Sequence, residues 1–217
     1  MNVRGETVNR VLVLGLDGAT WDLILPWVEE GELPTFKHLL NTSPWGRMES
    51  VPNMNSATAW TSFMTGKGPG KHGVYWFTER TPGSYEPRLA NRRRYGGGPT
   101  FWNLLSAADK RVGVMNIPMT YPAEEVNGFF ISGPGGVITG DYVYPASLRQ
   151  TIDEKFPDYK MALRELPDYA RRGQYKLAIQ RMLDVIDART RLLKYLLTNE
   201  PWDMVSVVNP ATDDTPP

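Results

Sequence analysis

Residues 11–18 read Val-Leu-Val-Leu-Gly-Leu-Asp-Gly, an apolar run that ends at Asp17 and Gly18. A run that is apolar on both faces is typical of a strand covered by helices on both sides of a parallel sheet. Such a strand delivers Asp17 at its carboxyl end, which is where open α/β sheets bind their ligands. The stretch therefore predicts an α/β fold with a mostly parallel sheet flanked by helices on both faces.

A hydroxyl group follows at the expected start of a helix, because Ser56 lies near the beginning of the segment 55–73. Two successive βα units place Asp17 and Ser56 on the same edge of the sheet. We expect their side-chain oxygens within about 6 Å, close enough to share one cation of a two-metal centre. Each residue also has a purely structural alternative, because Asp and Ser commonly cap the next helix. Together the two residues indicate a metal-assisted phosphoryl or sulfuryl transferase.

The composition fits one globular domain over residues 1–217, with 41% hydrophobic and 22% charged residues. Acidic and basic residues number 24 each, so no net charge favours binding to nucleic acid or to an anionic membrane. Cysteine is absent, which leaves any metal to Asp, hydroxyl groups and the two histidines, His38 and His72. No stretch has the length of a membrane span or signal peptide, so we expect a cytoplasmic protein.

Hydrophobic periodicity and turn residues divide the rest of the chain into elements. Residues 78–99 are rich in Pro and Gly and show no sustained period, which predicts a long loop or insertion. The apolar spacing from Tyr169 to Leu197 predicts one long amphipathic helix. We further expect helices from about Thr20 to Glu30, after Pro34 and from Pro99, and strands at Gly46–Ser50, Val112–Met115, Phe129–Ser132 and Met204–Val208.

Several of these segments together resemble a known group of enzymes. The sequence of residues 15–18 is followed by Ala-Trp-Thr-Ser-Phe-Met-Thr-Gly at 59–66 and by Pro-Gly-Lys-His-Gly at 69–73. This pattern is similar to the alkaline phosphatase superfamily, and to its type I phosphodiesterase/nucleotide pyrophosphatase-like branch in particular. The resemblance spans nearly the whole chain. Members of this branch are usually much longer, so the chain is interpreted as their amino-terminal part, truncated after about the fifth strand.

The resemblance implies roles for three residues. Asp17 corresponds to the family's first metal-binding aspartate, and Asp213 resembles the next one. Ser56 stands nine residues before Thr65, where the family has its nucleophile, while Thr58 takes this role if the alignment slips by two. The implied enzyme hydrolyses phosphate mono- or diesters of small molecules with two divalent cations, zinc or else manganese. A phosphomutase of the same superfamily and a non-catalytic fragment or pseudoenzyme are the alternatives.

The chain also departs from the family pattern. Pro217 stands four residues after Asp213, where the family has a metal-binding histidine, and the carboxyl-terminal Asp-His pair and final His are missing. The aromatic residues 75–77 occupy the region in which related pyrophosphatases carry a phosphate-contacting asparagine. The resemblance implies that His72 supports the site rather than binds metal.

Other polar and aromatic groups have structural explanations. Residues 92–94 are three consecutive arginines that either grip an anionic substrate or form a solvated charge run, and the second is favoured. The glycine-rich turn at 65–73 does not fit the spacing of a phosphate-binding P-loop. Core packing is the expected role of Trp21, Trp27, Trp60 and Trp102.

Overall fold

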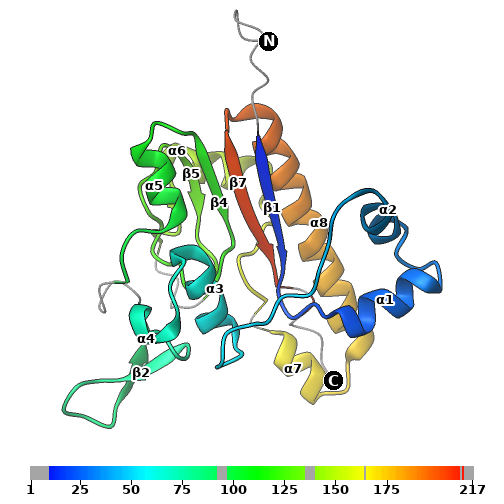
Figure 1. Ribbon diagram of the computed structural model, residues 1–217, viewed down its shortest axis with the longest axis horizontal. Helices are drawn as coiled ribbons and strands as arrows, with labels where there is room; N and C mark the ends of the chain where they lie inside the picture. The colour runs from blue at the N-terminus through cyan, green and yellow to red at the C-terminus, as the bar shows by residue number, and fades with distance from the viewer. Residues whose placement is uncertain (1–9, 92–96, 135–139, 164, 211, 213–217) are drawn as a thin grey trace, which may run out of the picture.

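The computed structural model describes residues 10–91, 97–134, 140–163, 165–210 and 212 (Figure 1). Helices and strands alternate along the chain, as expected of an α/β fold. The elements in chain order are β1 (Val11–Leu16), α1 (Trp21–Glu29), α2 (Pro34–Thr42), α3 (Ser56–Thr65), α4 (Pro69–His72), β2 (Thr78–Arg80), β3 (Pro87–Leu89), α5 (Phe101–Ala107), β4 (Val112–Met115), β5 (Gly128–Ile131), β6 (Val143–Tyr144), α6 (Ala146–Lys155), α7 (Leu166–Arg171), α8 (Tyr175–Asn199) and β7 (Met204–Asn209).

A five-stranded sheet forms the centre, in the order β1-β7-β4-β5-β6. The pairs β1–β7, β7–β4 and β4–β5 are parallel, and only β6 runs antiparallel to its neighbour. Leu16 at the end of β1 is in register with Asn209 at the end of β7. The predicted fold class is confirmed, and so is the prediction that Met204–Val208 lies parallel to β1. The carboxyl ends of both strands meet at one edge of the sheet.

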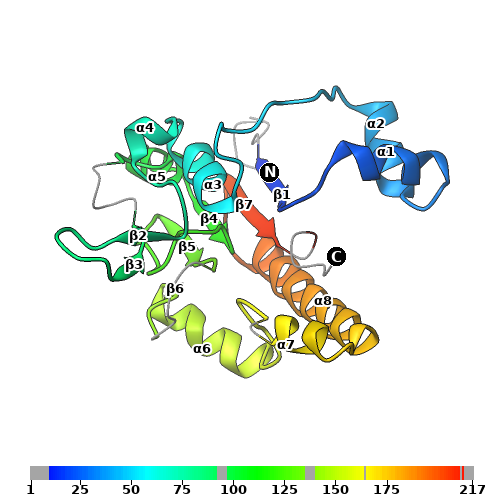
Figure 2. The same cartoon turned by 90° about the horizontal axis from the view of Figure 1, so that it is seen from below.

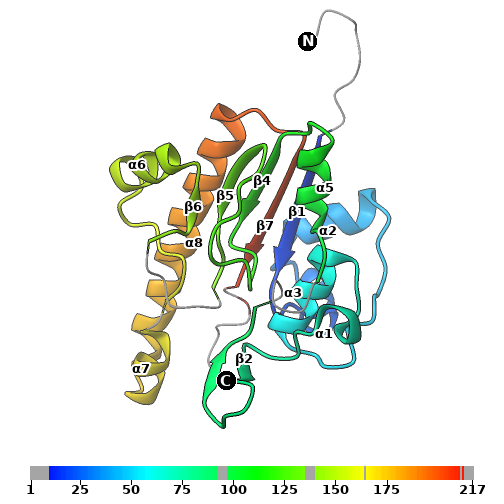
Figure 3. The same cartoon turned by 90° about the vertical axis from the view of Figure 1, so that its left-hand side faces the viewer.

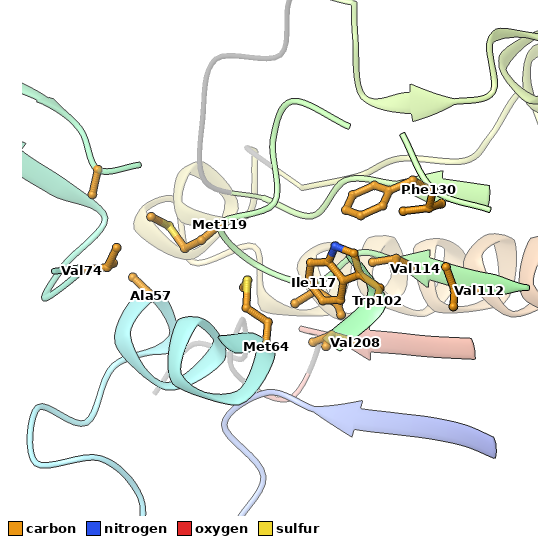
Figure 4. Close-up of a cluster of buried hydrophobic side chains, with 12 residues drawn as sticks. Ala57, Met64, Val74, Trp102, Val112, Val114, Ile117, Met119, Phe130 and Val208 are labelled. Atoms are coloured by element: carbon orange, nitrogen blue, oxygen red, sulfur yellow. The ribbon is translucent and has the colours of Figure 1, made fainter. Parts of the chain in front are cut away.

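Helices cover both faces of the sheet (Figures 2 and 3). On one face, residues of α3 and α5 pack with Val112, Val114 and Val208 around the fully buried Trp102, as Figure 4 shows. On the other face, α6 and α8 pack against Val205, Val207 and other strand residues. Successive strand residues therefore enter opposite cores, which explains why β4 and β7 are apolar along most of their length.

Polar residues cap the starts of α1 and α5, near the positions where the sequence predicts these helices to begin. The Thr20 side chain accepts a hydrogen bond from the backbone N–H of Asp22 and caps α1. Thr100 caps α5 and forms a reciprocal capping box with Asn103. Along α8, buried residues recur every three or four positions: Leu192 and Leu196 pack on the sheet, whereas Ala178 and Met182 near the start of the helix pack with Leu166 of α7.

Two expectations about the elements are wrong. Gly46–Ser50 is not a strand, because none of the described strands pairs with it, and Met48 within it is 92% exposed. Within the long loop or insertion expected at 78–99, β2 and β3 form an antiparallel hairpin. The helix expected over Tyr169–Leu197 is divided into α7 and α8, since Gly173 between them has a φ of +69°, which an α-helix cannot accommodate.

Helices α1 and α2 stand apart from the sheet beyond β1 (Figure 2). This position corrects the expectation that the tryptophans pack in the core, because Trp27 of α1 is 44% exposed. Trp21 of the same helix packs against Trp45, with ring centroids 5.1 Å apart. Within the described residues, no helix is both long and apolar enough to cross a membrane.

Candidate active site

Asp17 lies directly after β1 at the carboxyl edge of the sheet and is only 9% exposed. Its backbone N–H donates to the Asn209 carbonyl over 3.0 Å, and its own carbonyl accepts from the Thr212 hydroxyl. Asp17 does not cap the next helix, because Thr20 does so. The residue is fixed between the ends of two neighbouring strands, and its carboxylate is left to interact with α3.

Ser56 is the first residue of α3, and its hydroxyl donates to Asp17 Oδ1 over 3.1 Å. The two side chains thus meet well within the separation that the sequence predicts. Asn55, not Ser56, caps the helix, since the Asn55 side chain accepts from the Thr58 backbone N–H. The Thr58 side chain is fully buried and hydrogen-bonds Asn55, so the structure brings Ser56 rather than Thr58 to the carboxylate.

Trp60 is the site residue that the sequence interpretation missed. Its indole Nε1–H donates to the same Asp17 Oδ1 over 2.9 Å. Trp60 follows Ser56 by four residues in α3, so one turn of helix brings both donors to the same face. This spacing was the available signal, but a tryptophan in an amphipathic segment more often indicates core packing.

The carboxylate has one oxygen that the described residues leave free. Both hydrogen bonds end on Oδ1, and Oδ2 accepts none from the described part of the chain. A carboxylate oxygen beside a hydroxyl is a hard donor set of the kind that divalent cations prefer. The residues present therefore fit one side of a cation site. No group of three or more Asp, Glu, His or Cys gathers among the described residues, so this side is incomplete by itself.

Two further predicted groups cannot be placed. Asp213 and the arginine run 92–94 lie outside the described residues. Thr212, the residue before Asp213, is described and bonds to the Asp17 backbone carbonyl. Asp213 as a second metal ligand therefore stays a prediction.

His72 is fully buried behind α3 and supports it. Its Nδ1 accepts the backbone N–H of Val74 over 3.1 Å, so the proton of the neutral ring lies on Nε2 and is donated to Ser62 Oγ at 2.9 Å. Burial away from water lowers the pKa of His72, which favours this neutral form. The geometry agrees with the expected supporting role, because the imidazole joins the end of α4 to the middle of α3.

A second connection holds the start of α3. The Asn55 side-chain amide donates to the Tyr75 carbonyl over 3.0 Å, and the Asn53 amide donates to the same carbonyl. The segment after α4 is thereby tied to the N-terminus of the helix that carries Ser56. The free N–H groups of a first helical turn and the positive end of the dipole favour an anion at this position. A hydroxyl held by a carboxylate at such a helix start is suited to attack an electrophilic atom whose oxygen substituents carry negative charge.

The fold and this edge of the sheet define the class: a mostly parallel α/β domain of the alkaline phosphatase superfamily, with a carboxylate and a hydroxyl paired at the strand ends. The chain belongs to the type I phosphodiesterase / nucleotide pyrophosphatase family, whose model matches residues 11–215. The superfamily resemblance of the sequence is confirmed.

Solved structures share the fold at low sequence identity. Phosphonoacetate hydrolase from Sinorhizobium meliloti 1021, in complex with phosphonoformate, matches with a TM-score of 0.54 and 15% identity. The same enzyme in complex with phosphonoacetate matches with a TM-score of 0.50 and 16% identity. Each match covers 94% of this chain but 50% of the enzyme, so the chain spans half the length of these structures. A search of curated proteins found no match.

Proposed function

We propose that the chain forms the amino-terminal part of a metal-dependent hydrolase of phosphate mono- or diesters, with Ser56 as its nucleophile. The observation that carries the proposal is the 3.1 Å hydrogen bond from Ser56 Oγ to Asp17 Oδ1 at the N-terminus of α3. Through this bond the Asp17 carboxylate can accept the hydroxyl proton of Ser56, and the N-terminus of α3, where Ser56 lies, favours the binding of phosphate oxygens. Family membership over residues 11–215 supports the same reaction class.

Each residue then has a definable task. Asp17 Oδ1 orients the Ser56 hydroxyl, and Trp60 holds this carboxylate oxygen from a second direction. Ser56 Oγ attacks phosphorus, the ester oxygen leaves, and water later hydrolyses the phosphoserine ester. Asp17 Oδ2, which accepts no hydrogen bond from the described residues, and the Asp213 carboxylate are the proposed ligands for two divalent cations, zinc or manganese. Bound cations supply positive charge that lowers the pKa of the serine hydroxyl and stabilises the non-bridging phosphate oxygens.

The described donors are too few for two cations, so we propose that the remaining ligands come from protein beyond Pro217. The test compares residues 1–217 with a longer polypeptide in which the reading frame continues. p-Nitrophenyl phosphate, bis-p-nitrophenyl phosphate and phosphonoacetate serve as substrates, with zinc or manganese added. We expect residues 1–217 to turn over no faster than their Ser56→Ala variant, because both cations are needed for charge stabilisation.

The longer polypeptide should be active and lose at least about a thousandfold in kcat upon Ser56→Ala, because the covalent step then has no nucleophile. Asp17→Asn should also lower the rate, since the amide cannot take the serine proton or bind a cation well. Ser43→Ala is the matched control, because Ser43 is an exposed residue at the end of α2. Metal-dependent turnover that survives Ser56→Ala would refute the assignment. Phosphoryl return to the substrate would instead show a phosphomutase.

A further inference from the structure

Trp60 holds one oxygen of the Asp17 carboxylate and undergoes no chemical change in the proposed reaction. Its indole N–H and the Ser56 hydroxyl both donate to Asp17 Oδ1, over 2.9 Å and 3.1 Å. Ser56 gives up its proton when it attacks phosphorus, and it can then no longer donate to Oδ1. An indole nitrogen is a donor only and keeps its proton. Trp60 is therefore the donor that stays on Oδ1 through the whole reaction.

The packing around Trp60 fixes the direction of this N–H. The indole lies against the backbone of Gly15, where an added Cβ would be 2.5 Å from Trp60 Cη2. The Phe63 ring packs against the indole at an interplanar angle of 84°, with centroids 5.5 Å apart. Gly15 and Asp17 are two residues apart and so face the same side of the sheet. One ring therefore covers Gly15 while its N–H reaches the Asp17 carboxylate.

The hydrogen bonds on Oδ1 determine how many oxygens Asp17 offers to a cation. Oδ2 accepts no hydrogen bond from the described residues, so it can bind a cation without first losing a donor. Zinc in proteins takes about four ligands, whereas calcium takes about six to eight oxygens and can bind both oxygens of one carboxylate. A carboxylate that offers a single oxygen consequently suits zinc better than calcium.

We propose that Trp60 is a positioning residue that determines the cation selectivity of the site: by keeping Oδ1 hydrogen-bonded, it restricts Asp17 to one ligand oxygen and disfavours calcium relative to zinc. This inference rests on the proposed function, in which Asp17 binds a cation. The Ser56 hydroxyl is not sufficient for this role, because rotation about its Cβ–Oγ bond or loss of its proton releases Oδ1. Removal of a hydrogen-bond partner of a metal ligand typically changes metal affinity by about 10–100-fold.

The substitution Trp60→Phe tests the proposal, because it keeps an aromatic ring and removes the N–H. Trp102→Phe is the matched control, since the Trp102 indole N–H also donates to a carboxylate, Glu124 Oε2, over 3.2 Å. The rings of Phe63 and Phe101 lie between the two indoles, so the control substitution does not touch the site. Dissociation constants for zinc and for calcium are measured by isothermal titration calorimetry in the longer polypeptide. Circular dichroism verifies that each variant is folded.

In Trp60→Phe, the ratio of the calcium to the zinc dissociation constant should fall at least about tenfold, because zinc loses a fixed ligand while calcium gains a second oxygen. Trp102→Phe should keep the ratio of the parent protein. An unchanged ratio in Trp60→Phe, whether both affinities stay or both decrease equally, would overturn the proposal. An equal fall of the ratio in the two variants would also overturn it, since the effect would then not depend on Asp17.

A second measurement needs no variant. Hydrogen exchange of the Trp60 indole N–H, followed by NMR of isotope-labelled protein, should be slow without metal and stay slow after zinc is added, because the bond to Oδ1 persists. Loss of this protection with zinc would overturn the proposal, as would a folded longer polypeptide that binds neither cation. Trp60-dependent selectivity without Ser56-dependent hydrolysis would support the inference and refute the proposed function. Ser56-dependent hydrolysis with an unchanged ratio would refute the inference alone.

Discussion

Gly15→Ala tests how tightly β1 and α3 are packed beside the site. A Cβ at Gly15 would lie 2.5 Å from Trp60 Cη2 and 3.1 Å from Val208 Cγ2. The first separation is far below contact distance, so the indole must move. Overpacking of this kind costs about 1–3 kcal/mol. A shifted indole also weakens its bond to the Asp17 carboxylate, and hydrogen bonds to charged groups contribute about 1.5–3 kcal/mol.

We therefore expect Gly15→Ala to lower the free energy of unfolding by about 2–4 kcal/mol, less than the sum because the two effects share one ring. For a chain of this size, that corresponds to a fall in Tm of roughly 5–15 °C. Urea and thermal unfolding followed by circular dichroism measure both quantities. Gly46→Ala is the matched control, because a Cβ there meets nothing within 4 Å. Its stability should stay within about 1 kcal/mol of the parent protein.

A double-mutant cycle identifies the partner in the clash. Trp60→Phe removes the ring atoms that face Gly15. In the Trp60→Phe background, Gly15→Ala should therefore lower the free energy of unfolding by a smaller amount than in the parent protein, with a difference of at least about 1 kcal/mol. Additivity within about 0.5 kcal/mol would show that Trp60 is not what the new methyl group meets. A Gly15→Ala protein as stable as Gly46→Ala would refute the packing argument as a whole.

Two further predictions concern the support of α3. Burial lowers the pKa of His72, so the free energy of unfolding should decrease as the pH falls from about 6.5 towards the lower folded-state pKa, at no more than about 1.4 kcal/mol per pH unit. NMR titration of the histidine ring protons measures the folded-state pKa of His72, and unfolding of His72→Asn shows whether the pH dependence of stability comes from this residue. A folded-state pKa at or above 6.5 would contradict the prediction. Asn55→Ala should cost about 0.5–2 kcal/mol in urea unfolding, and more than Ser56→Ala, because Asn55 caps α3. The reverse order would show that Ser56 is the cap.

Local signals predicted much of the sheet. The apolar runs at β1, β4 and β7 each identify a strand without reference to the rest of the chain, although several side chains of β1 are exposed in the described structure. Thr20 and Thr100 likewise indicate helix starts through their own side chains. The Asp17–Ser56 contact was predicted from two successive βα units; the strand expected before Ser56 does not form, yet α3 still begins beside the carboxyl end of β1.

The errors arose where structure depends on partners distant in sequence. The strand expected at Gly46–Ser50 requires a neighbouring strand, and the described chain does not supply one. The sequence predicts Trp60 as a core residue, because only the folded structure shows that the Asp17 carboxylate lies within hydrogen-bond distance of its indole N–H. The break between α7 and α8 was visible as Gly173, yet a single glycine does not always end a helix.

The two hydrogen bonds on Asp17 Oδ1 have a consequence for affinity. Ser56 and Trp60 approach that oxygen from successive turns of one rigid helix, so rotation of the carboxylate about its Cβ–Cγ bond is restricted before anything binds. The rotational entropy is lost during folding rather than when a ligand arrives. The orientation of Oδ2 is consequently fixed before binding. A ligand that binds Oδ2 therefore loses less affinity to the immobilisation of this side chain.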